Sequence, residues 1–234
     1  MDYGLSLLAM GAGLAPLYRG ENPEQKLAQL TEGTLPISTY MRAGFTFLKM
    51  MIDNGYLDIE QALSTQPNSE EERNRFRDGQ CALISTICRG SAFSDDYPFE
   101  MAMTAMPILE EGTICVVGAD QRLAVNPNSK HLDEALAAVE ALGTVETLNE
   151  FARLQRKTSS ARGNEAATLP QAAPLISSLT ADEQIPNQDF SLHFNTWNTI
   201  KELCVKLGEG ASVDAVCEEY DTLQLQEIAT YPGQ

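Results

Sequence analysis

Hydrophobic side chains recur at helical spacing along much of this chain, and the pattern predicts a helix-rich protein. Over residues 38–54 they fall three or four positions apart and form one apolar face, as in an amphipathic helix. Asn54 and Gly55 supply the left-handed turn that ends such a helix. Ser129 is the predicted N-cap of a later helix. The other predicted helices cover 12–19, 59–63, 69–76, 131–142, 144–154, 173–179, 190–207 and 212–229.

Short apolar runs bounded by turn residues predict the strands. The first strand covers residues 3–9 (YGLSLLA), and glycines in the turn at 10–13 (MGAG) would let a ligand approach the backbone. Residues 21–36 are predicted to be a surface connection with no more than one helical turn. Further strands are predicted over 81–87, 99–106, 112–117 and 121–125. Helices and strands together indicate an α/β fold.

Composition limits the kinds of partner that we expect. The chain has 234 residues, of which 43% are hydrophobic and 21% charged, as in a globular protein of one or two domains. Its formal net charge of −17 repels phosphate backbones, so no nucleic-acid partner is predicted. No stretch approaches the roughly 18 apolar residues of a membrane span. Residues 5–17 do not resemble a signal peptide, so composition alone indicates a cytoplasmic chain.

The sequence contains no signature of a catalytic or metal site. Its five cysteines form no CxxC pair, and its two histidines, His131 and His193, occur in no HExxH or HxH arrangement. Glycine-rich nucleotide-binding loops and the GxSxG nucleophile motif do not occur either. We therefore expect no metal, no cofactor and no enzymatic activity.

Several short motifs occur in an order typical of one protein family. They are LKMMIDNGY at 48–56, FRDGQCAL at 76–83, MAMTAMP at 101–107, the glycine-containing segment 112–120 and LAVNPNSKHLDEA at 123–135. A late helix with Trp197 and the SVDA start of the last helix complete the series. In this order the motifs resemble the family-1 extracellular solute-binding proteins of ABC importers, the maltose-binding-like group. The resemblance covers about residues 3–228.

The resemblance implies a periplasmic-binding-protein-like type II fold, represented mostly by its C-terminal lobe, which is helix-rich with a small mixed sheet. Residues 1–105 and 160–234 would form this discontinuous lobe, and 106–159 would cross to the N-terminal lobe. Family members have a leader and a first lobe ahead of the point where this chain starts. We therefore expect a fragment, or a first lobe on another chain, or a crossing segment that packs in a different way.

The resemblance also implies a function. Proteins of this family capture a small solute in a cleft between two lobes, leave it unaltered and deliver it to a membrane permease. A sugar or oligosaccharide is the expected solute, and the expected place is extracellular, at the cell surface as a lipoprotein or in the periplasm. Two alternatives stay open. One is an interaction or structural fragment without its own ligand, and the other is a carbohydrate-active enzyme domain.

Five residues are candidate ligand contacts. Trp197 matches a position near the start of the late helix where an aromatic side chain often contacts the ligand, although a lone Trp there is core about as often. Arg89 follows a predicted strand and offers planar donors to hydroxyls or acids, or else pairs with a surface acid. Gly11 is a candidate because of its predicted turn, which is otherwise a plain tight turn. Tyr40 and Tyr97 lie in predicted loops near these elements.

Overall fold

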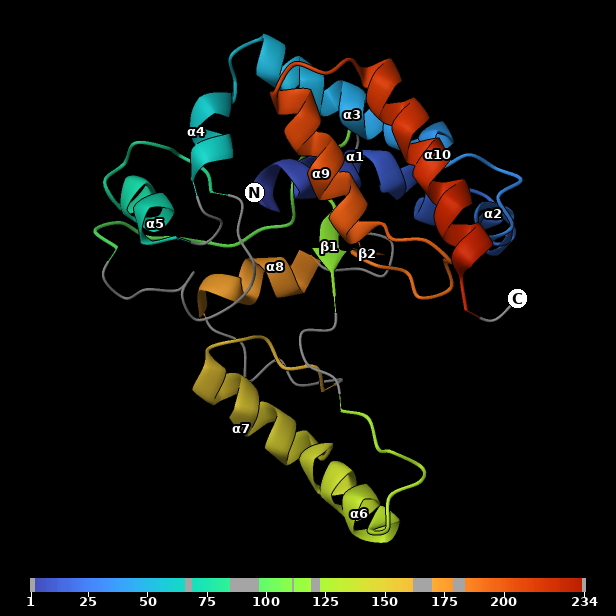
Figure 1. The fold of residues 1–234 in the computed structure, drawn as a ribbon. Coiled ribbons are helices and arrows are strands. Elements are labelled where there is room, and N and C mark those ends of the chain that lie inside the picture. The colour runs from blue at the N-terminus through green and yellow to red at the C-terminus, as the bar shows by residue number, and fades with distance from the viewer. Residues whose placement is uncertain are drawn as a thin grey trace. The chain divides into compact units, whose positions relative to one another are not determined.

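In the computed structural model the described residues are mostly helical and include two short strands (Figure 1). It describes residues 3–65, 69–84, 97–110, 112–118, 123–161, 170–178 and 184–232. The helices are α1 Tyr3–Arg19, α2 Pro23–Thr31, α3 Ser38–Asp53, α4 Ile59–Ser64, α5 Glu70–Arg77, α6 Leu132–Leu142, α7 Val145–Gln155, α8 Ala173–Ser178, α9 Trp197–Gly208 and α10 Val213–Thr230. The 3-10 helix Pro170–Ala172 leads into α8. The strands are β1 Cys115–Val117 and β2 Gln184–Pro186.

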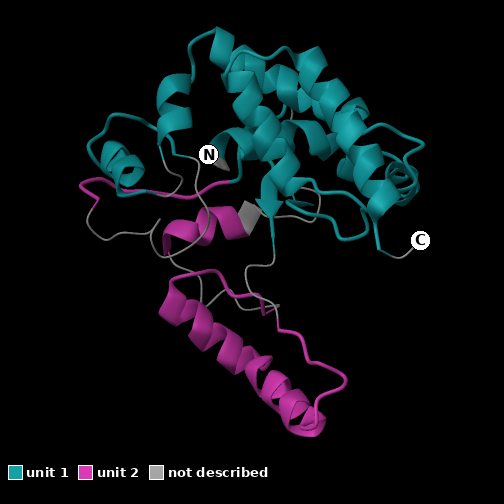
Figure 2. Cartoon of the chain, viewed as in Figure 1, with its two compact units in different colours: residues 1–86, 105–118, 179–234 teal, residues 87–104, 119–178 magenta. Residues whose placement is uncertain are grey.

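Segments that are far apart in the sequence build each of two compact units (Figure 2). Unit 1 comprises 1–86, 105–118 and 179–234, and unit 2 comprises 87–104 and 119–178. Both units are thus discontinuous in sequence. The boundaries of the lobes inferred from the family resemblance stay a prediction.

Helix α1 lies at the centre of unit 1 and corrects the predictions for its residues. The predicted strand over 3–9 and the turn at 10–13 are wrong, because one helix runs through both. This helix packs against α2, α3 and α9 and contacts both strands. Most of its side chains are buried, among them Leu5, Met10 and Leu14. A helix that is surrounded on all sides lacks the apolar stripe of a surface helix, so its pattern does not distinguish it from a buried strand.

Glycine residues let α1 and α3 approach one another closely. A Cβ atom on Gly44 of α3 would overlap the Ala9 carbonyl oxygen of α1 and would lie 2.9 Å from the carbonyl carbon. A Cβ atom on Gly13 of α1 would lie 2.7 Å from the sulfur of Met41. These glycines therefore serve helix packing, and they do not interrupt α1.

Helices α3, α9 and α10 complete the core of unit 1. The amphipathic helix predicted over 38–54 is confirmed by α3, which buries Phe45 and Leu48 among others. Gly55 has the predicted left-handed backbone, at φ 69°. Tyr220 of α10 is fully buried, and its ring centroid lies 6.5 Å from that of Phe45. Such ring pairs add about 0.5–1.5 kcal/mol to the stabilisation that their burial provides.

The other helix predictions are confirmed with three corrections. Helices α4, α5, α6, α7, α8 and α10 lie where the pattern placed them. The surface connection predicted at 21–36 contains the nine-residue helix α2, which Pro23 opens in the position where proline suits a helix start. The helix predicted from residue 190 begins only at Trp197. Ser129 is not an N-cap, because its hydroxyl oxygen accepts from the His131 N–H and α6 begins after that histidine.

The sheet of unit 1 is smaller than predicted. Strands β1 and β2 pair in parallel, and Met106 makes one antiparallel bridge with Ile114. The strand predicted over 112–117 is confirmed at its last three residues, but the described parts of the other three form no strand, apart from the Met106 bridge. A strand needs a partner, and within the described residues only β1, β2 and this bridge have one. The helix-rich α/β class is confirmed, and among the described residues the sheet consists of two parallel strands, whereas a mixed sheet was predicted.

Unit 2 contains the consecutive helices α6 and α7, which bury little. Within the described residues α6 buries no side chain, and α7 buries only Ala152. Thr144 caps α7 from the adjacent position, since its hydroxyl oxygen accepts from the Thr147 N–H at 3.3 Å. Several large apolar side chains of the two helices are exposed, namely Leu136, Leu142, Val145, Phe151 and Leu154.

Candidate functional site

The predicted contact residues come from different elements of the structure. Trp197 opens α9, and Tyr40 lies in α3 and not in the predicted loop, so both belong to unit 1. Both side chains are partly buried. Burial raises the pKa of the Tyr40 phenol above its usual value, so it stays neutral. Tyr97 belongs to unit 2, where its ring centroid lies 5.6 Å from that of Phe99. Arg89 lies outside the described residues.

Gly11 lies inside α1 and faces apolar side chains. A Cβ atom at this position would lie 2.8 Å from Ile108, 2.9 Å from Ile114 and 3.2 Å from Met106. The turn that made Gly11 a candidate does not exist, and these three side chains fill the space that a ligand would need at this backbone. The glycine instead allows the segment next to β1 to pack on the helix.

Trp197 is the chain's single tryptophan, and a cation lies over its ring. The Lys201 ammonium, one helical turn further on, is 5.3 Å from the ring centre. An indole attracts such a cation through its quadrupole, with about 0.5–1 kcal/mol at an exposed site. The pair places an apolar ring next to an ammonium group with three hydrogen-bond donors.

The Gln188 side chain binds the start of α9 from a position shortly after β2. Its Oε1 accepts from the Thr196 N–H at 2.9 Å, from the Thr196 hydroxyl at 3.1 Å and from the Trp197 N–H at 3.4 Å. Its Nε2 donates to the carbonyl oxygens of Asp189 at 3.1 Å and Phe194 at 3.3 Å. One amide thus connects both ends of the segment 189–196, which we call the α9 loop.

Asp189 ties the α9 loop to α1. Its Oδ2 accepts from the Tyr18 hydroxyl at 3.0 Å, and its Oδ1 accepts from the N–H and the hydroxyl of Ser191 at 2.9 and 2.6 Å. Burial above all, and then the charge and hydrogen bond of Asp189, raise the pKa of Tyr18 far above its usual range. The phenol is therefore neutral and can serve as a donor to the carboxylate.

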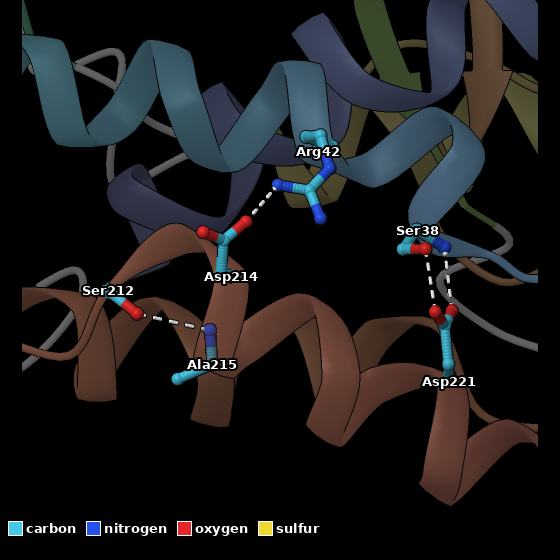
Figure 3. A network of polar contacts seen from close by, with 6 residues as sticks. All are labelled: Ser38, Arg42, Ser212, Asp214, Ala215 and Asp221. Atoms are coloured by element: carbon cyan, nitrogen blue, oxygen red, sulfur yellow. Dashed lines mark hydrogen bonds and ion pairs between the residues drawn. The ribbon is translucent and has the colours of Figure 1, made fainter.

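A second polar network joins α10 to the start of α3 (Figure 3). The Asp221 carboxylate accepts from the Ser38 N–H at 2.9 Å and from the Ser38 hydroxyl at 2.6 Å. The first N–H groups of a helix have no partner within it, and a negative charge there also suits the helix dipole. Arg42 and Asp214 form an exposed ion pair between the same two helices. Asp221 therefore caps α3 from another helix.

Gln224 extends this network into the core. It is 1% exposed, and its amide is fully used within the protein. Its Nε2 donates to the carbonyl oxygens of Leu30 at 2.8 Å and Leu35 at 3.0 Å, and its Oε1 accepts from the Ile37 N–H at 2.8 Å. Gln224 thus holds the connection between α2 and α3, which is a structural role.

Sequence reasoning proposed Trp197 as a ligand contact, which stays a prediction, and did not single out the residues that bind its backbone. Gln188 and Asp189 follow β2 in a polar run, which is a common pattern for any surface loop. The local signal at this helix start is Asn195, whose Oδ1 accepts from the Asn198 N–H at 2.7 Å. Nothing in the local sequence points to Gln188 as a further partner.

Comparisons with known proteins give no match from which a function could be assigned. No family model, no curated protein and no solved structure matches the chain. No helix in the described part of the chain is long and apolar enough to cross a membrane. Over the same residues, no three side chains of His, Cys, Asp or Glu are grouped so that they could hold a metal ion.

Proposed function

We propose that this protein is the substrate-binding component of an ABC import system, which captures a small solute and leaves it unaltered. The observation that carries the proposal is the position of Trp197 as the first residue of α9. The family resemblance expects an aromatic ligand contact near the start of this helix. The order of the sequence motifs from NGY to SKH supports the same assignment.

The coarse fold is compatible with this proposal. A helix-rich α/β unit with a small sheet, built from discontinuous segments, is what the C-terminal lobe of a type II periplasmic-binding-protein-like fold requires. We assign residues 1–105 and 160–234 to that lobe and 106–159 to a crossing toward an N-terminal lobe. A second chain that supplies the first lobe belongs to the proposal as a possible partner.

The proposed solute is a sugar or an oligosaccharide. Sugars present flat C–H faces, which stack on an indole, and hydroxyl groups, which pair with nearby donors and acceptors. Trp197 supplies such a ring, and the Lys201 ammonium, which lies over it, supplies hydrogen-bond donors. Tyr40, Tyr97 and Arg89 remain candidate contacts. A membrane permease would receive the solute, and the protein would act outside the cell or in the periplasm.

A thermal-shift screen against mono- and oligosaccharides tests the proposal. A solute at a hundred times its Kd stabilises a one-site protein by about 2.7 kcal/mol, which raises the Tm of a domain of this size by roughly 5–10 °C. Trp197→Ala should then weaken binding of that sugar about 30-fold, as expected when a buried aromatic contact of about 2 kcal/mol is lost.

Tyr56→Ala is the matched control, since Tyr56 is an aromatic side chain of unit 1 that is 67% exposed. It should leave sugar binding unchanged. Unaltered binding by Trp197→Ala would remove the proposed contact. Turnover of a sugar would favour the carbohydrate-active enzyme, and no response to any sugar would favour a fragment without its own ligand.

A further inference from the structure

The start of α9 is capped only in part from its own segment. The Asn195 Oδ1 accepts from the Asn198 N–H at 2.7 Å, and the N–H groups of Thr196 and Trp197 have another partner. Thr196, which precedes the helix, has a helical backbone at φ −94° and ψ −49°, and its side chain makes no cap hydrogen bond. Its hydroxyl instead donates to the Asn187 carbonyl oxygen at 2.9 Å and to Gln188. The first N–H groups of a helix need a partner, and a helix start without one is destabilised.

Gln188 adds a partner for the N–H groups that Asn195 does not bind, those of Thr196 and Trp197. Its Oε1 accepts from the N–H groups of both Thr196 and Trp197, so the acceptor lies directly at the first backbone groups of α9. Its Nε2 is turned toward the α9 loop and binds Phe194 and Asp189 through their carbonyl oxygens. One side chain therefore sets both the first residue of α9 and the path of the loop that leads to it.

Other contacts also hold the α9 loop in place, in addition to the Gln188 amide. Leu192 and Phe194 are buried, at 4% exposure each, and Asp189 is bound to Tyr18 of α1. The Asn195 N–H donates to Glu227 of α10 at 2.5 Å. With these anchors in place, the Gln188 amide is the contact that links the loop to the Trp197 backbone itself.

We propose that Gln188 is the positioning residue for Trp197: its amide caps α9 and thereby fixes where the indole ring stands. A side chain at the first residue of a helix moves with the backbone when the first turn frays. The consequence for solute binding rests on the proposed function, but the effect on the indole does not. Sites keep their geometry only when a supporting set of hydrogen bonds holds the contact residues.

Gln188→Met tests this, because methionine has a similar size and makes none of the five hydrogen bonds. Fluorescence quenching by acrylamide reports on Trp197 alone, since it is the chain's single tryptophan. Without any sugar, the quenching constant should rise in Gln188→Met. Binding of a sugar identified with the wild-type protein should weaken about tenfold, the equivalent of 1.4 kcal/mol.

The matched control is Gln224→Met, which also removes an amide with three hydrogen bonds to the backbone of unit 1. It should lower the Tm but leave the quenching constant of the folded protein at its wild-type value. Gln188→Asn replaces Gln188→Met as the test variant if the methionine variant does not fold. The shorter amide does not reach both ends of the α9 loop, so the same rise in the quenching constant is expected.

The outcomes separate this inference from the proposed function. Wild-type quenching in a folded Gln188 variant, or an equal rise in Gln224→Met, would overturn the positioning role. A rise specific to Gln188 supports it, even where no sugar binds the wild-type protein, and in that case only the proposed function fails.

Discussion

The two units of this protein stabilise their helices in different ways. In unit 1, distant side chains add to local caps: Asp221, 183 positions from Ser38 in the sequence, caps α3, and Gln188 adds to the local cap of α9 by Asn195. In unit 2, α7 is capped by the adjacent Thr144. Burial differs in the same sense, because α3 packs into the core of unit 1 whereas α6 has no buried side chain among the residues described.

The comparison indicates how cooperative each unit is. When a helix depends on side chains from other helices for its cap and its core, it does not unfold without them. A helix with a local cap and exposed sides opens at a lower free energy. We therefore expect substitutions in unit 1 to affect the whole unit, and those in α6 and α7 to have local effects.

Gly44→Ala should have the largest effect. The added Cβ would overlap the Ala9 carbonyl oxygen, so α1 and α3 would have to move apart. Overpacking of this kind costs about 3 kcal/mol of the free energy of unfolding. Urea denaturation followed by Trp197 fluorescence measures it, because the tryptophan lies in unit 1.

Gly143→Ala is the counterpart in unit 2. Gly143 has φ −83°, and its Cβ would lie 3.2 Å from the Val139 carbonyl oxygen, a tight contact that a small shift relieves. The stability change should stay within about 0.5 kcal/mol. If both substitutions lowered the free energy of unfolding equally, the close approach of α1 and α3 would not be what makes Gly44 sensitive to substitution.

The sequence predicts helices whose caps lie beside them better than it predicts contacts from distant residues. The caps Asp58, Ser69, Thr144 and Ser212 lie next to the helices that they serve, and α4, α5, α7 and α10 were predicted where they occur. The start of α9 was placed seven residues too early, because Phe190 and Phe194 of the α9 loop continue the helical spacing. Its true start has a local cap from Asn195 and a further contact from Gln188, and no local pattern contains the second.

The candidate site shows the same limit. Trp197 was proposed from the family resemblance as the single tryptophan in an amphipathic helix, and its role as a ligand contact stays a prediction. Gly11 was misjudged, since glycine that allows helix packing and glycine that forms a turn look alike in a sequence. Only the approach of Ile108 and Ile114 distinguishes the two cases.

Tyr18→Phe should have an intermediate effect that depends on pH. At neutral pH it removes the hydrogen bond to Asp189 and should lower the stability of unit 1 by about 1 kcal/mol. The folded pKa of Tyr18 is raised, whereas the unfolded chain releases this proton near its usual pKa of about 10. Above that pH the unfolded state binds fewer protons, so the wild-type protein loses stability as pH rises, and the variant lacks this loss.

Urea denaturation from about pH 8 to about pH 11 tests the sign. The stability gap between the wild type and Tyr18→Phe should narrow as pH rises. Tyr220, whose pKa burial also raises, is present in both proteins and does not contribute to the gap. A constant gap would mean that Tyr18 titrates alike in the folded and unfolded chains, and a widening gap would mean that folding lowers its pKa.

Leu154→Gln should have the smallest effect and sharpens the comparison from the side of unit 2. Leu154 lies near the C-terminus of α7 and is 63% exposed, so the substitution removes little buried apolar surface. The free energy of unfolding should change by no more than about 0.5 kcal/mol. Leu48 in α3 is 0% exposed. Leu48→Gln should lower the free energy of unfolding several-fold more, because it buries an amide without a hydrogen-bond partner. Circular dichroism during urea denaturation measures both variants. A large loss of stability from Leu154→Gln would mean that apolar contacts cover α7 in solution. The two units would then not differ in how cooperatively they unfold.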